Sequence, residues 1–146
     1  MSLATVKGAV KTRLDALVTA GTLAGATITD IKKNPLSSDF GAYPHAFLMP
    51  PAIESSALDN RTNLRTYTFS IMVLYNAENL TTTSQLETSI EAILNAFDND
   101  PTLNGTGMGG VEPVSSSPEP FQHGGKDLIM VEIVIKARDI ISLSFA

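Results

Sequence analysis

The stretch from Leu64 to Tyr75, LRTYTFSIMVLY, decides the fold because large apolar residues occupy every second position in it. These alternating residues are Tyr67, Phe69, Ile71, Val73 and Tyr75. Successive side chains of a strand point to opposite faces, so the pattern predicts a strand with one buried face. The other face begins with threonine and serine and ends with Met72 and Leu74, which predicts partial cover of that face.

A second long strand with the same alternation is predicted from Leu128 to about Arg138. Weaker strand patterns occur at Ala26–Ile31, His45–Met49, Ile53–Ser56 and Val111–Val114. The segment Thr102–Lys126 is rich in glycine, serine and proline, and it is otherwise predicted to be a loop with a mobile tip at Ser115–Pro120. The short apolar tail Ile140–Ala146 is expected to need a partner.

Two amphipathic helices accompany these strands. The first is predicted over Ser2–Ala20, where apolar residues three and four apart form one stripe. The second follows Thr81–Ser84, with Ser84 and Glu87 spaced as a capping box, and it ends near Asp98–Pro101. Two helical stripes and two strand faces bury each other in a two-layer sandwich, so the predicted fold is α+β. We expect one domain over residues 1–146, a mostly antiparallel sheet, and both helices on one face.

The composition narrows the class of protein. The 146 residues carry 10 Lys+Arg and 15 Asp+Glu, a net charge of −5, and no cysteine. These values exclude a disulfide framework and thiolate metal sites, and they argue against a surface that grips phosphate backbones. No apolar run is long enough to span a membrane and no secretory signal is apparent, so a soluble domain compatible with the cytosol is expected.

The chain contains motifs that resemble known sites, but none has the required context. The cluster Gly105–Gly110 satisfies G-x-G-x-x-G, yet a helix precedes it and a strand follows, the reverse of a dinucleotide fingerprint. Asp98 and Asp100 begin like a calcium loop, but Leu103 stands where that loop requires glycine, so a solvated helix end is expected.

The remaining candidates for chemistry are isolated from one another. His45 and His123 have no ligand partner at a suitable spacing and are predicted to be structural side chains. Glu112 and Glu119 are not paired as acid and base. The Asn-x-Thr triplets and small basic groups are read as ordinary surface; they are Asn60, Asn79, Asn104, Lys32-Lys33 and Lys7–Lys11–Arg13. We therefore predict no catalytic, cofactor-binding or metal-binding residues, no cofactor and no enzymatic activity.

Apolar residues on the second strand faces are the feature that a monomer leaves unexplained. They are Leu64, Met72 and Leu74 on the first long strand, Leu128, Met130 and Val134 on the last, and Leu143 and Phe145 in the tail. One interpretation is scattered surface residues, which every protein has. The other, which we favour, is a subunit that completes its burial against copies of itself.

The order of these motifs resembles the tail terminator (tail completion) proteins of long-tailed bacteriophages. The similar features are an N-terminal helix, YPHAFLMPP at Tyr43–Pro51, R-x-Y-x-F-x-I-x-V at Arg65–Val73, ILNAFDNDPTLNG at Ile93–Gly105, and the strand Leu128–Arg138. The resemblance implies a hexameric ring at the head-proximal end of the tail, which stops tube polymerisation and presents a surface to the head connector.

The same resemblance implies partners and interfaces. It implies contacts with the major tail tube protein and a connector protein, a virion location after assembly in the host cytoplasm, and passage of DNA without specific binding. It places the loops Asp30–Tyr43 and Gly105–Lys126 at interfaces. The alternatives are another ring component of the phage neck, such as a head-completion or stopper protein, and a small cytosolic ligand-binding or hydrolytic domain.

Overall fold

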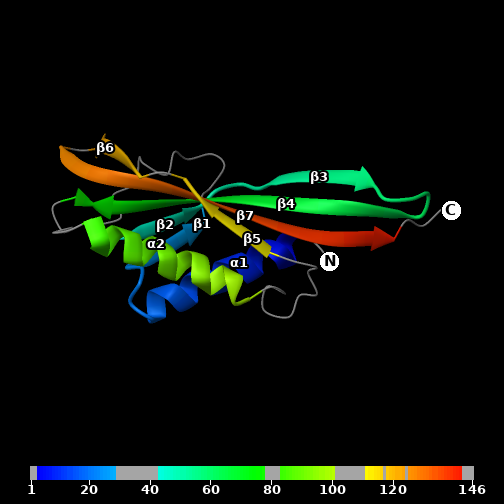
Figure 1. Ribbon diagram of the computed structural model, residues 1–146, viewed down its shortest axis with the longest axis horizontal. Helices are drawn as coiled ribbons and strands as arrows, with labels where there is room; N and C mark the ends of the chain where they lie inside the picture. The colour runs from blue at the N-terminus through cyan, green and yellow to red at the C-terminus, as the bar shows by residue number, and fades with distance from the viewer. Residues whose placement is uncertain are drawn as a thin grey trace.

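Two helices and a seven-stranded sheet form an α+β sandwich in the computed structural model of the chain, with both helices on one face of the sheet (Figure 1). The structure describes residues 3–28, 43–77, 83–100, 111–116, 118–123 and 125–142. The predicted fold class is thereby confirmed, because strands of alternating pattern and amphipathic helices bury each other in two layers.

The centre of the sheet is a long antiparallel pair, β4 (Thr62–Asn76) and β7 (Lys126–Ser142). Their ladder runs without a break from Thr62–Ser142 to Asn76–Leu128. Both strands were predicted, but both are longer than the apolar alternation indicated. The start of the expected tail, Ile140–Ser142, belongs to β7, because its backbone pairs with the first residues of β4.

Five shorter strands flank this pair. β2 (His45–Leu48) and β3 (Ala52–Ala57) pair side by side with different halves of β4, and β1 (Gly25–Ile28) pairs in parallel with β2. β5 (Val111–Ser115) and β6 (Glu119–His123) pair in the same way with β7. All pairs except β1–β2 are antiparallel.

The helices cover the sheet face that carries the alternating apolar residues. α1 (Leu3–Thr19) contacts β1, and α2 (Thr83–Asp98) contacts β5. The buried core between the layers includes Val6, Val10, Leu14, Leu86, Ile93, Phe97, Tyr67, Phe69, Ile71, Val131, Ile133 and Ile135. α2 begins at Thr83, so Ser84 lies inside its first turn and not at the cap that the capping box required. Neither described helix is long and apolar enough to cross a bilayer.

The prediction for the glycine- and proline-rich segment was wrong in part. Ser115 ends β5, and Glu119 and Pro120 begin β6, where a mobile loop tip was expected. Pairing with the outer edge of β7 explains the difference, because an edge strand tolerates prolines that a central strand would not. The stretches 29–42 and 101–110, which hold the cluster Gly105–Gly110 and most of the loop Asp30–Tyr43, lie outside the described residues.

Candidate assembly surface

The sheet face opposite the helices, here called the helix-free face, differs from its prediction in one respect. Leu74 and Leu128 were expected to be uncovered, but they are 0% and 1% exposed. They form a small second core with Phe47, and the half-buried residues Tyr43, Met49, Met72 and Met130 pack against it. The second core arises because β2 places Phe47 in register with Met72, on the same face. Leu64 and Val134 are half-buried, while Leu143 and Phe145 lie outside the described residues.

A hollow of about 300 Å³ adjoins this second core. It is lined by Met49, Ser70, Met72, Ser116, Glu119, Met130 and Glu132. The Ser70 hydroxyl donates to Glu132 at 2.7 Å, and the Ser116 hydroxyl accepts from the Glu132 backbone N–H at 3.0 Å. The three methionines give it a flexible apolar floor, which suits contact with another protein better than the fixing of a small polar ligand.

The helices leave one end of the sheet uncovered. This part, here called the arm, consists of β3, the turn at 58–61, the start of β4 from Thr62 to Thr66 and the end of β7 from Arg138 to Ser142. Figure 1 shows it extending beyond both helices at the right. All six residues of β3 are exposed.

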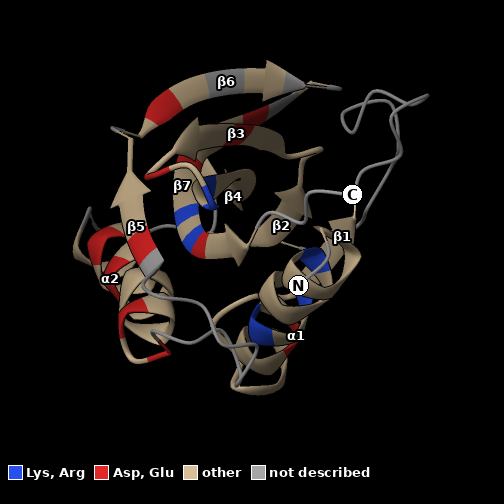
Figure 2. Cartoon of the chain, turned by 90° about the vertical axis from the view of Figure 1, so that its right-hand side faces the viewer, with Lys and Arg blue, Asp and Glu red and all other residues tan. Residues whose placement is uncertain are grey.

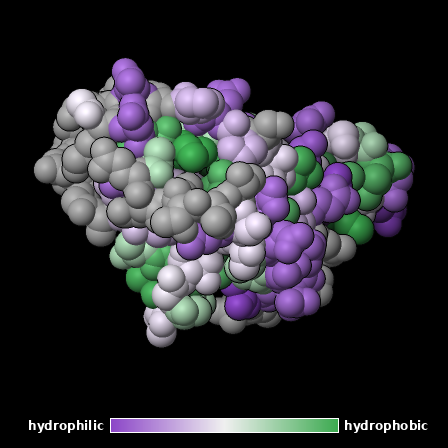
Figure 3. Space-filling model, turned by 60° about the vertical axis from the view of Figure 1, so that its left-hand side comes forward, coloured by the Kyte–Doolittle hydropathy of each residue, from purple (hydrophilic) through white to green (hydrophobic). Residues whose placement is uncertain are grey.

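Large apolar side chains lie on the arm without cover. Ile53 is 49% exposed, Leu58 is 53% exposed and Ile140 is 62% exposed. Directly paired strand residues share a face, so Ile53 lies on the same face as Tyr67 and Ile140 on the opposite one. Hydrophobic surface is visible at the right-hand end of the space-filling view, interspersed with polar residues (Figure 3). The arm therefore presents apolar residues on both of its faces.

The tip of the arm is held by an aspartate turn. The carboxylate of Asp59 accepts hydrogen bonds from the backbone N–H groups of Arg61 at 2.7 Å and Thr62 at 2.8 Å. These bonds favour the ionised form, and the backbone bond from Arg61 is the main reason that the pKa of Asp59 is lowered. Asp59 was not among the predicted site residues, although an aspartate two residues before an N–H donor is the usual signal of such a turn.

An ion pair joins α1 to the residues that follow α2. Arg13 donates to one oxygen of Asp100, from Nη2 at 2.7 Å and from Nε at 3.2 Å. The Asp100 side chain is only 9% exposed. The expectation of a solvated helix end is therefore wrong for Asp100 and holds for the exposed Asp98, because Arg13 of α1 folds back over the end of α2.

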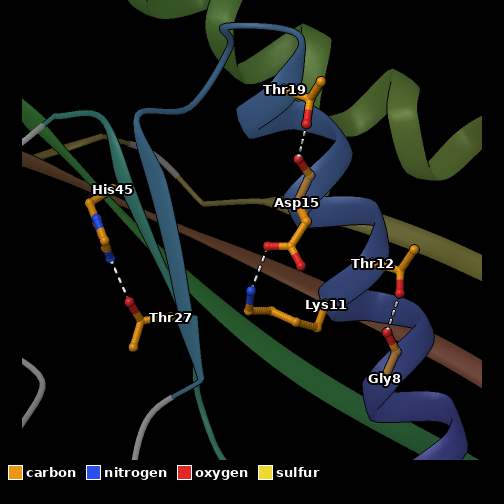
Figure 4. Close-up of polar contacts among 7 residues, drawn as sticks. All are labelled: Gly8, Lys11, Thr12, Asp15, Thr19, Thr27 and His45. Atoms are coloured by element: carbon orange, nitrogen blue, oxygen red, sulfur yellow. Dashed lines mark hydrogen bonds and ion pairs between the residues drawn. The ribbon is translucent and has the colours of Figure 1, made fainter.

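His45 was predicted to be a structural side chain, and the structure places it in a buried position. It is 8% exposed, and its Nε2 lies 2.8 Å from the Thr27 hydroxyl (Figure 4). Its ring packs 4.7 Å from that of Phe47. Burial, and secondly the charge of Lys11, lower its pKa. On α1, Lys11 pairs with Asp15 one turn away. The side chain of His123 lies outside the described part of the molecule.

Charged residues are distributed unevenly over the body. α2 carries acidic residues and no basic ones, whereas α1 carries Lys7, Lys11 and Arg13 (Figure 2). On the helix-free face, Arg138 pairs with Glu112 at 2.8 Å, and this contact lowers the pKa of Glu112. Glu112 and Glu119 lie on separate strands, so the structure does not bring them together as an acid and base.

The described residues hold no group of three or more potential metal ligands. A second hollow of about 460 Å³ lies where α1 ends and α2 begins, and its lining side chains are uncharged. The arm and the neighbouring helix-free face are therefore the candidate functional surface.

Comparison with known proteins finds a solved structure with a similar fold. No protein-family model and no curated protein matches the chain. A solved structure does: a chain of "Virion of native gene transfer agent (GTA) particle" is similar with a TM-score of 0.59 and 18% identity, over 90% of this chain and 92% of that chain. The protein thus shares its α+β fold, along nearly its whole length, with a component of a gene transfer agent virion.

Proposed function

We propose that the protein is a structural virion component that caps the phage tail tube as a ring, stops tube polymerisation and forms the joining surface for the head connector. Two independent observations support this role. The fold is similar to a chain from a virion particle, and the order of sequence motifs resembles the tail terminators. The role requires no bond to be made or broken.

The arm is the observation that carries the proposal. Its exposed apolar residues lie on both faces, so no single layer of the protein's own chain could cover them. A long, exposed strand edge invites pairing with another chain, and natural monomers normally prevent this. A subunit designed to be built into an assembly accounts for the arm, because the neighbouring chain provides the missing cover.

A ring explains termination in physical terms. A ring that offers tube-like contacts on one side only binds the last tube ring and gives the next tube subunit no template. Its net charge of −5 suits a channel through which DNA passes without being held, because like charges repel the phosphate backbone.

Deletion of the gene followed by electron microscopy tests the proposal. We expect overlong or headless tails, and complementation with the wild-type gene should restore tails of normal length joined to heads. Ile140→Glu on the arm should fail to complement, whereas Ile28→Glu on β1 should complement as the control, because Ile28 is also exposed, at 40%, but lies outside the arm and on the face that the helices cover. Tails of normal length that join heads in the deletion strain would refute the capping role.

A further inference from the structure

The free edges of the sheet differ in how they are protected against pairing. β5 and β6 contain Pro113 and Pro120, and proline is a residue that blunts an edge strand. β3, with the sequence AIESSA, contains no proline and no basic residue, and Glu54 is its only charge. β3 is therefore an exposed edge without the usual protection.

The arm has two open edges. The inner edge of β3 pairs with β4 from Ala52–Thr68 to Ala57–Asn63, and its outer edge has no partner within the described residues. On the other side of the arm, the pairing of β5 with β7 ends at Val111–Ala137. The backbone of β7 from Arg138 to Ser142 consequently forms a second edge that is unpaired within the same described part of the chain.

These two edges are similar in length, and one row of residues ends in opposite charges at the two edges. Glu54, Thr66 and Arg138 form one row across the arm, on the helix-free face. The next row on that face ends in Ser56 on one edge and Ile140 on the other. Side-by-side repetition of the arm brings Arg138 of one copy to Glu54 of the next, and it gives exposed Ile140 a neighbour. The Arg138 guanidinium has five donors, so its contact with Glu112 does not exhaust it.

We propose that the outer edge of β3 pairs with the Arg138–Ser142 edge of β7 in a second copy of this chain. β3 and β7 both run antiparallel to β4, so the new pair is parallel. The contact joins two different edges, and head-to-tail contacts of this kind form a ring when the rotation between neighbouring copies closes. The inference rests on the proposed function in that it supplies the contact between ring subunits.

Disulfide cross-linking tests the contact directly, because the natural chain has no cysteine. The double variant Glu54→Cys/Arg138→Cys is purified and oxidised, and the products are separated under denaturing, non-reducing conditions. Within one subunit the two positions are separated by β4, about 9.5 Å at the usual strand spacing, which is beyond the roughly 7 Å that a disulfide spans. Any bond must therefore join two copies.

We expect a ladder of cross-linked species above the dimer for this variant and for Ser56→Cys/Ile140→Cys. Each single-cysteine variant should give at most a dimer, and the control pair Thr27→Cys/Arg138→Cys, which uses β1 in place of β3, should give no ladder. Absence of a ladder from both arm pairs overturns the proposal, as does a strictly monomeric wild-type protein.

The experiment separates this inference from the proposed function. Wild-type rings seen by microscopy without a ladder from either arm pair would refute β3 pairing and leave the capping role intact. A ladder from the arm pairs, together with tails of normal length in the deletion strain, would support the edge contact and refute capping.

Discussion

Replacement of Gly25 by alanine should destabilise the protein, against the usual effect of this change in a strand. A Cβ atom built at Gly25 lies 2.8 Å from both Cε1 and Nδ1 of His45. The ring cannot move aside freely, because it is buried, bonded to Thr27 and packed on Phe47. Gly25 does not have a positive φ, so without this contact alanine would stabilise by about 0.4–1 kcal/mol.

The expected magnitude follows from the two effects of the collision. Overpacking costs about 1–3 kcal/mol, and loss of the bond between His45 and Thr27 adds about 0.5–1.5 kcal/mol. We therefore expect Gly25→Ala to lower the free energy of unfolding by about 1–4 kcal/mol, measured by urea unfolding with circular dichroism at one fixed protein concentration.

A double-mutant cycle isolates the cause. His45→Ala removes the ring, so adding Gly25→Ala to that variant should leave stability unchanged or raise it slightly. An equal loss of stability from Gly25→Ala in both backgrounds would refute the reasoning, since the cost would then not come from contact with the His45 ring.

Three further outcomes are expected. Asp100→Ala should lower the free energy of unfolding by about 1.5–3 kcal/mol, because it leaves Arg13 without its carboxylate. Asp15→Ala removes an exposed ion pair and should lower the free energy of unfolding by less than about 1 kcal/mol. Denaturant titration of both variants compares the two losses. The pKa of His45 is lowered in the folded protein, so below the ordinary value of 6.5 the unfolded chain binds a proton more readily than the folded protein does. The free energy of unfolding should therefore fall as the pH drops from 7.5 to 5.5, and His45→Gln should reduce this pH dependence in unfolding curves recorded across the range. An unchanged pH dependence in His45→Gln would contradict this prediction. Tyr75→Phe should cost about 0.5–1.5 kcal/mol through loss of the 2.8 Å bond to Ser89, while Tyr67→Phe should be neutral or stabilising in thermal melts, because the buried Tyr67 hydroxyl has no partner among the described residues.

Strict periodicity made the central elements predictable. The alternation from Tyr67 to Tyr75 and from Ile129 to Ala137 identified the two long strands and the face that the helices bury. The ends of these strands were not predictable, because the residues of the arm lack a consistently buried face and their pairing depends on backbone contacts with distant segments. β6 escaped prediction for the same reason, since Pro120 argues against a strand until β7 provides an edge for it.

An exposed apolar surface was predicted from the sequence, but its position in the fold was not. The apolar residues of the second faces indicated self-association, yet Leu74 and Leu128 are covered by Phe47, whose position depends on the register of β2. Neither the exposed Ile53 nor Leu58 stood out, because their short segments show no periodicity. The burial of Asp100 depends on Arg13, 87 residues away, and no local pattern reports such a contact.

The continuity of β4 and β7 has a consequence for the proposed assembly. Each strand is anchored in the helix-covered core along most of its length and forms the arm with its end, so the arm is fixed at its base. At about 3.3 Å per residue, the 15 residues of β4 span about 50 Å. An incoming neighbour meets a strand that already has its final shape, so docking does not bear the entropic penalty of ordering a loose segment.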